Sequence, residues 1–120
     1  MRIMFAAPDR DLLECYKKLL EDDLGETVTA FDGTQVLSLL SAERFDVAVL
    51  DDALPRIGFE KLAKRIDEEK IPLVVLTDGG TASYRRTAGS GGAYLTYPFT
   101  PETMENVIKD ALEKAAEEDE

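Results

Sequence analysis

Two adjacent aspartates, Asp51 and Asp52, follow an apolar run in the middle of the chain, in the segment "FDVAVLDDALP". A carboxylate at the end of a buried strand can take part in chemistry, or it can only hydrogen-bond the loop that follows. Polar residues also follow two other apolar runs: Asp9 comes after "RIMFAAP" and Thr77 ends "IPLVVLT". If these runs are parallel strands of one sheet, their ends lie together, and the sequence predicts a polar site at that edge.

The apolar runs alternate with segments of helical spacing, which is typical of a parallel α/β sheet. Strands are expected over 2–7, 26–31, 46–50, 71–77 and 93–97, and helices from Asp9, over 34–41, over 59–70 and from Pro101. The two least apolar runs, 26–31 and 93–97, should lie at the edges of the sheet. This favours the strand order 2-1-3-4-5. The predicted fold class is therefore α/β, a three-layer α/β/α arrangement around a five-stranded parallel sheet, as in flavodoxin-like folds.

The first helix and a glycine-rich segment carry two further expectations. The apolar face of the first helix is predicted to contain Leu12, Cys15, Tyr16, Leu19 and Leu20, with Cys15 as an inert core residue. Residues 78–93 carry five glycines and have room for at most one short helix. We expect 79–92 to be the least ordered internal segment.

The overall composition limits the classes of function. The 120 residues fit one domain, expected over 1–116 and followed by an acidic tail, 117–120. The net charge of −11 argues against direct binding of nucleic acid or an anionic membrane. The lack of histidine excludes Ser-His-Asp catalysis and histidine-based zinc sites, and the single cysteine excludes an internal disulfide. No apolar run approaches the roughly 20 residues of a membrane span, and a cytoplasmic, reducing location is expected.

The segments "VLDDALP" and "YPFTPE", together with Thr77 and Tyr94, occur in the order and at the strand positions that resemble the receiver domain of bacterial two-component response regulators. The resemblance covers roughly residues 2–115. It implies that Asp51 is the aspartate that accepts a phosphoryl group from a histidine of a sensor kinase. It also implies that Thr77 binds the phosphoryl oxygens and that Tyr94 is the aromatic residue that turns inward when the domain switches.

The sequence departs from this family at the positions that supply charge. The acidic pair that holds magnesium in the family is replaced by Ala7 and Pro8, and the lysine that pairs with the phosphorylated aspartate is replaced by Tyr97. Pro98 matches a family proline whose preceding peptide bond is cis. Phosphoryl transfer depends on the metal and on fixed positive charge, whereas a tyrosine supplies one hydrogen-bond donor and no charge. We therefore expect Asp51 to be phosphorylated poorly or not at all, and magnesium to bind at most weakly.

Three classes of function remain open. The favoured one is a receiver that acts as a protein-interaction switch without phosphorylation. The second is a phosphorylatable receiver in which Asp9 or Asp52 helps Asp51 to hold magnesium, although Asp9 also suits a helix cap and Asp52 a turn. The third is a flavodoxin-like cofactor-binding protein, but "AAPDRD" lacks the small polar residues of a phosphate-binding loop. Thr77 and Tyr94 also suit purely structural roles, in which Thr77 caps a loop and Tyr94 packs at the edge of the sheet.

The resemblance implies a protein partner and no enzymatic activity. The partner would be a sensor kinase, a downstream effector, or a second copy bound through the face formed by helix 4, strand 5 and helix 5. No resident cofactor is expected, and neither nucleic acid nor a membrane is expected to bind this domain directly.

Overall fold

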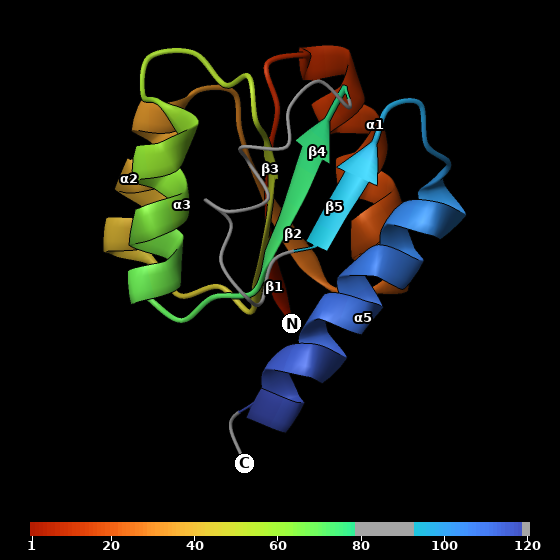
Figure 1. Ribbon diagram of the computed structural model, residues 1–120. Coiled ribbons are helices and arrows are strands. Elements are labelled where there is room, and N and C mark those ends of the chain that lie inside the picture. The colour runs from red at the N-terminus through yellow and green to blue at the C-terminus, as the bar shows by residue number, and fades with distance from the viewer. Residues whose placement is uncertain (79–92, 119–120) are drawn as a thin grey trace.

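Five parallel strands form one sheet in the computed structural model, which describes residues 1–78 and 93–118 (Figure 1). The strands are β1 (Arg2–Ala6), β2 (Glu26–Ala30), β3 (Val47–Asp51), β4 (Leu73–Thr77) and β5 (Ala93–Thr96). Their order is β2-β1-β3-β4-β5, and every neighbouring pair is parallel. The predicted order and the predicted edge strands are both confirmed, and the strand bounds differ from the expected ones by one or two residues at an end.

The four described helices lie on both faces of this sheet. They are α1 (Arg10–Asp23), α2 (Gly33–Ala42), α3 (Phe59–Glu68) and α5 (Pro101–Glu118). Helices α2 and α3 cover one face, and α1 and α5 cover the other (Figure 1). Helix α5 includes two residues of the expected acidic tail. The expectations of a short helix within 78–93 and of low order over 79–92 lie outside the described residues.

Two apolar cores, one on each side of the sheet, explain why three strands are continuously apolar. In β3 and β4 every residue is buried, because alternate side chains enter opposite cores. The core under α2 and α3 takes Met4, Ala6, Ala48, Leu50, Leu73 and Val75, and the core under α1 and α5 takes Ile3, Phe5, Val47, Val49, Val74 and Leu76. Because each strand contributes to both cores, a change of register would expose apolar side chains on both faces.

The buried face of α1 differs from the predicted one. Leu13, Tyr16 and Leu20 are buried, whereas Leu12 and Leu19 are only half-buried at the margin of the core. The prediction that Cys15 is a core residue is wrong, because its side chain is exposed. Leucines at four positions of this helix allow two apolar stripes about 100° apart, and packing on the sheet decides between them.

Aspartates begin both helices that enter from the carboxyl edge of β1 and β2. Asp9 caps α1, since its Oδ1 accepts hydrogen bonds from the N–H groups of Asp11 at 3.0 Å and Leu12 at 3.3 Å. The capping role predicted for Asp9 is therefore confirmed. Asp32 caps α2 in the same way, with a 2.8 Å bond from the Gln35 N–H.

The loop between β3 and α3 rests on the first turn of α2. The Gly33 N–H donates to the Pro55 carbonyl at 3.0 Å, and Arg56 pairs with Asp32 at 3.4 Å. Gly33 has no room for a side chain, because a Cβ there would lie 2.5 Å from the Cβ of Ile57. This contact places the loop that follows Asp51 directly against a helix start.

No helix within 1–78 or 93–118 has the length and the apolar character needed to cross a membrane.

Candidate functional site

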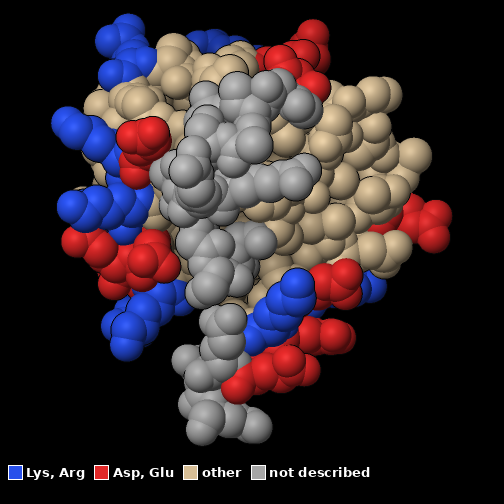
Figure 2. Space-filling view, viewed as in Figure 1, with Lys and Arg blue, Asp and Glu red and all other residues tan. Residues whose placement is uncertain are grey.

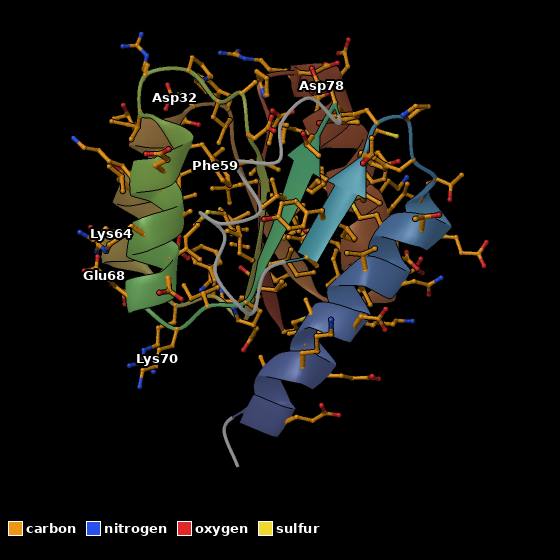
Figure 3. All side chains as sticks on the ribbon, viewed as in Figure 1. Asp32, Phe59, Lys64, Glu68, Lys70 and Asp78 are labelled. Carbon is orange, nitrogen blue, oxygen red and sulfur yellow. The ribbon has the colours of Figure 1, made fainter. Side chains whose placement is uncertain are left out.

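The backbone brings the residues that follow β1, β3 and β5 to one edge of the sheet. Each of three hydrogen bonds extends the ladder by one residue: from Ala7 N–H to the Ala30 carbonyl at 3.1 Å, from Asp52 N–H to Leu76 at 3.0 Å, and from Tyr97 N–H to Thr77 at 2.9 Å. The labelled Asp32 and Asp78 mark this edge in Figure 3, and Lys70 marks the opposite end. The site that the sequence predicted at the strand ends therefore forms as one contiguous region.

Asp51, the last residue of β3, has both carboxylate oxygens hydrogen-bonded. The residue is only 7 % exposed. Oδ1 accepts the N–H of Ala53 at 2.7 Å, which turns the chain directly after the strand. Oδ2 accepts the hydroxyl of Tyr97 at 2.7 Å. Two neutral donors therefore hold a nearly buried carboxylate in a fixed orientation.

Tyr97 stands where the family resemblance places a lysine. Burial, followed by the hydrogen bond to Asp51, raises the pKa of the Tyr97 phenol well above its usual value of 10.0. The phenol therefore stays protonated and remains a donor at every physiological pH. The Tyr97–Pro98 peptide bond is cis, as predicted.

Asp52 lies in different surroundings from those of its neighbour. Its side chain is half-buried, and burial raises the pKa of its carboxyl, as do the charges of Asp51 and Asp78. A hydrogen bond from Thr77 acts in the opposite direction and lowers that pKa. Thr77 is itself buried at the end of β4, so this hydroxyl is fixed within the site.

The positions that hold metal ligands in the family do not offer them here. Ala7 is fully buried, Pro8 is exposed, and the carboxylate of Asp9 caps α1. Among the residues that the structure describes, no group of three or more acidic or cysteine side chains is arranged to hold a metal ion. The nearby Arg10 guanidinium lies over the Phe31 ring at 4.2 Å. Ala7 and Pro8 therefore supply no side-chain oxygen to a divalent cation beside Asp51.

The two tyrosines of the β5 region serve opposite sides of the sheet. Tyr94 is half-buried and packs against the core under α2 and α3, and in the strand register it lies beside Val75. Tyr97 packs against the core under α1 and α5. The structure therefore brings Asp51, Thr77 and Tyr97 together at the edge. Tyr94 lies within β5, away from that edge.

Two aromatic residues that the sequence did not single out for the site support Tyr97. The centroid of the Phe99 ring lies 5.0 Å from that of Tyr97, and Tyr16 lies 5.6 Å from Phe99. Phe99 was visible in the motif "YPF", but its contact with a helix that begins about 90 positions earlier has no local signal. The partner of Tyr16, Phe5, stacks on it at 5.8 Å.

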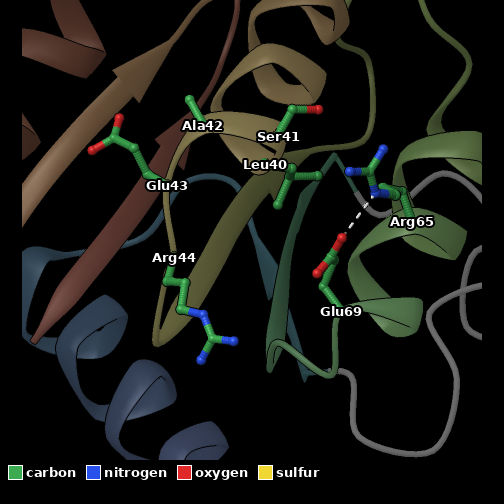
Figure 4. A pocket seen from close by; sticks show the side chains of 7 residues that line it. All are labelled: Leu40, Ser41, Ala42, Glu43, Arg44, Arg65 and Glu69. Carbon is green, nitrogen blue, oxygen red and sulfur yellow. Dashed lines mark hydrogen bonds and ion pairs between the residues drawn. The ribbon is translucent and has the colours of Figure 1, made fainter.

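A groove elsewhere on the molecule has no link to this site. It measures about 460 Å³ and is lined by Leu40, Ser41, Ala42, Glu43, Arg44, Arg65 and Glu69 (Figure 4). Its charges are largely matched, because Arg65 pairs with Glu69 at 3.1 Å and Glu43 pairs with Arg2. On the face seen in Figure 2, acidic and basic side chains also alternate and do not gather into a patch of one sign.

The sequence is similar to those of several response regulators. A transcriptional regulator, ycf27 of Cyanophora paradoxa, is 31% identical over 82% of this chain and 44% of its own length. The response regulator MprA of Mycobacterium avium is 28% identical over 99% of this chain and 54% of its own length. The chain thus spans about half the length of the curated relatives that it matches.

Solved structures share the fold over almost the whole chain. A CheY-like receiver domain protein of Methanospirillum hungatei superimposes with a TM-score of 0.86 and 23% identity, covering 98% of this chain and 97% of that one. The response regulator DrrB of Thermotoga maritima gives 0.80 and 27% identity, covering 94% of this chain and 52% of that one. The family described as the response regulator receiver domain matches residues 3–109. With the strand order, the aspartate at the end of β3 and these similarities in place, the chain belongs to the response regulator receiver domain family.

Proposed function

We propose that this receiver domain works as a protein-interaction module of two-component signalling in which phosphorylation at Asp51 is impaired or absent. Asp51 occupies the acceptor position, and Thr77 and Tyr94 occupy the positions of the switch residues. The domain carries out no chemistry of its own and needs no cofactor. Its output depends on the conformation that a protein partner selects.

The observation that carries this proposal is the neutral surroundings of Asp51. Both of its oxygens accept hydrogen bonds from uncharged donors, the Ala53 N–H and the Tyr97 hydroxyl. Transfer of a phosphoryl group to this carboxylate would bring further negative charge beside Asp52 and Asp78, whose charges already act on one another. Such a transfer relies on a cation or a fixed positive group to offset that charge. Neither Ala7 nor Tyr97 can supply one.

A second candidate function is a phosphorylatable receiver with an altered metal site. One observation favours it: Asp52 is half-buried beside Asp51, so a second carboxylate is close at hand. Asp9 is less suited to this task, because it already caps α1. A cation held by Asp51 and Asp52 would need most of its remaining ligands from water.

The partner is a sensor kinase, a downstream effector or a second copy of the domain. The relatives are response regulators about twice as long as this chain, which supports a role within such a pathway. Of the face formed by helix 4, strand 5 and helix 5, the described part consists of β5 and α5. The charged residues along α5 would make a salt-sensitive contribution to any contact there.

Incubation with acetyl phosphate tests the proposal. With millimolar magnesium and intact-mass detection, we expect at most a trace of a singly phosphorylated species. A double variant, Pro8→Asp with Tyr97→Lys, returns one carboxylate and the lysine at positions where Pro8 is exposed and Tyr97 half-buried. This variant should gain phosphorylation that Asp51→Asn abolishes.

Efficient labelling of the wild-type chain that Asp51→Asn removes would instead establish the second candidate. In that case Asp52→Asn should reduce the labelling and weaken magnesium binding. Circular dichroism of each variant confirms that the comparison is between folded proteins.

A further inference from the structure

The Tyr97 hydroxyl reaches Asp51 across the end of an intervening strand. β4 lies between β3 and β5 in the sheet, and the Tyr97 N–H is itself bonded to the Thr77 carbonyl at the end of β4. The side chain then spans that strand end and donates to Asp51 Oδ2 at 2.7 Å. This bond therefore ties together the ends of two strands that share no backbone hydrogen bonds.

A row of aromatic rings continues from Tyr97 to α1 and β1. Phe99 packs on Tyr97 at 5.0 Å with the ring planes inclined by 33°, and Tyr16 packs on Phe99 at 5.6 Å and 58°. Tyr16 in turn stacks on the fully buried Phe5 at 5.8 Å and 13°. We call Tyr97, Phe99, Tyr16 and Phe5 the aromatic row. Phe5 and Tyr16 are buried, and Tyr97 and Phe99 are half-buried, so each ring packs against the next along the row.

We propose that Tyr97 is a positioning residue that permanently fixes the Asp51 carboxylate, and that the aromatic row transmits any change at Asp51 to α1. The proposal rests on the proposed function in one respect, that a protein partner responds to the state of Asp51. Tyr94 is not part of the aromatic row, because it packs into the core on the opposite side of the sheet. The surface that responds to Asp51 is thus the one formed by α1 and the loop that begins at Tyr97.

The hydroxyl also obstructs modification of Asp51. An incoming group that bonds to Oδ2 must first displace a donor at 2.7 Å, and Oδ1 is held by the Ala53 N–H. Removing the hydroxyl alone would not supply the missing charge. Tyr97→Phe should therefore stay unphosphorylated in the acetyl phosphate assay, and only the lysine substitution at this position should help.

A double-mutant cycle in urea tests the bond itself. The four proteins are the wild type, Tyr97→Phe, Asp51→Ala and the combination of both. A hydrogen bond to a charged acceptor predicts a coupling of at least about tenfold between the two substitutions in the unfolding equilibrium constant. The cycle is needed because Asp51→Ala also relieves the repulsion between Asp51 and Asp52, so the effect of that variant alone has no fixed sign.

Tyr16→Phe is the matched control. It removes a hydroxyl from another member of the aromatic row and keeps the ring, and no hydrogen bond of that hydroxyl is found among the described residues. Combined with Asp51→Ala, it should give additive effects. Additive effects of Tyr97→Phe with Asp51→Ala would overturn the proposal.

Nuclear magnetic resonance tests the transmission, with a variant that preserves the shape of the acceptor. Asp51→Asn should shift the ring resonances of Phe99 and Tyr16 in the wild-type background. The Tyr16 shift should be lost in Phe99→Leu. This substitution removes the ring between Tyr97 and Tyr16 and keeps the Tyr97 hydroxyl. If Asp51→Asn leaves Tyr16 unchanged, or if the shift survives Phe99→Leu, the row does not transmit.

These outcomes are independent of the phosphorylation assay. A wild-type domain that is readily phosphorylated would contradict the proposed function and leave the coupling between Tyr97 and Asp51 to be decided by the cycle. A domain that resists phosphorylation but shows no coupling would keep the proposed function and remove the positioning role of Tyr97.

Discussion

Asp51 and Asp52 are neighbours in the chain, but their carboxylates have opposite surroundings. Asp51 is held by two donors, whereas the dominant influence on Asp52 is burial, which raises its pKa. The raised pKa means that the ionised form of Asp52 is less stable in the folded protein than in the unfolded chain. The folded state therefore binds more protons than the unfolded state near this pKa, and the free energy of unfolding falls as the pH rises through it.

Asp52→Asn should consequently raise the urea midpoint at pH 7. Asparagine keeps an oxygen that can accept the Thr77 hydrogen bond and removes the charge. The gain should shrink as the pH falls through the raised pKa towards the ordinary Asp value of 3.8, because the wild-type carboxyl is then protonated. Urea titrations at a series of pH values measure this.

Asp110→Asn controls for the removal of one charge from a chain of net charge −11, because Asp110 is exposed on α5. A gain of equal size in both variants, or one that persists at low pH, would contradict an effect specific to the site.

The sequence allowed part of this site to be predicted. The family pattern placed Asp51 and Thr77 at the ends of buried strands, and the lack of charge at Ala7, Pro8 and Tyr97 can be read directly from residue types. The contact between Asp51 and Tyr97 could not be predicted from the residues alone, because 46 positions separate them and another strand lies between. Their partnership depends on side-chain reach, which only the folded sheet defines.

At the scale of elements, the aspartates that begin α1 and α2 fix the two loops nearest the site. Asp32 accepts the Gln35 N–H at 2.8 Å and pairs with Arg56 of the loop after β3. It thereby joins the start of α2 to the segment that follows Asp51. Such caps are favoured at helix starts because the first N–H groups have no partner within the helix.

Asp32→Ala should lower the free energy of unfolding by about 1 kcal/mol, within the range of roughly 0.5–2 kcal/mol measured for lost helix caps. Arg56→Ala should cost less, because its side chain is 72% exposed and exposed ion pairs contribute about 1 kcal/mol at most. Urea denaturation gives both values. Equal losses in the two variants would mean that the ion pair, and not the cap, supplies the stability.

The helix faces show where sequence periodicity is decisive and where it is not. The buried residues of α3 are Phe59, Leu62, Ala63 and Ile66, and they follow the helical spacing of its sequence because its polar residues leave a single apolar stripe. In α1 the leucine pairs left two stripes possible, and the packing of Tyr16 on Phe5 accompanies the burial of one of them. Which stripe is buried depends on a residue of β1, so it could not be predicted from the sequence of the helix. For this reason Cys15 was wrongly predicted to be a core residue.

At the scale of the whole molecule, the sheet separates two cores that share the same strands. Ile66 of α3 and Ile108 of α5 are both fully buried, and they lie on opposite faces. Within residues 1–78 and 93–118 no side chain belongs to both cores, so a small cavity on one side has no direct contact with the other. The backbones of the strands lie between the two cores.

Ile66→Val and Ile108→Val should each lower the free energy of unfolding by about 0.5–1.5 kcal/mol, the usual cost of one buried methylene. The double variant should lose the sum of the two values to within about 0.5 kcal/mol, because the sites share no partners. Urea titrations of the three variants decide this. A larger departure from additivity would show that the sheet backbone relays strain between its faces.

The contact between Gly33 and Ile57 has a consequence for the history of this sequence. Since a Cβ at position 33 would lie 2.5 Å from the Cβ of Ile57, the two positions cannot vary independently. A descendant that gains a side chain at position 33 must first lose bulk at position 57 or lengthen the loop that carries it. An intermediate that gains the side chain at position 33 before either change would carry this clash, so glycine at position 33 confines the paths by which the loop beside Asp51 can diverge.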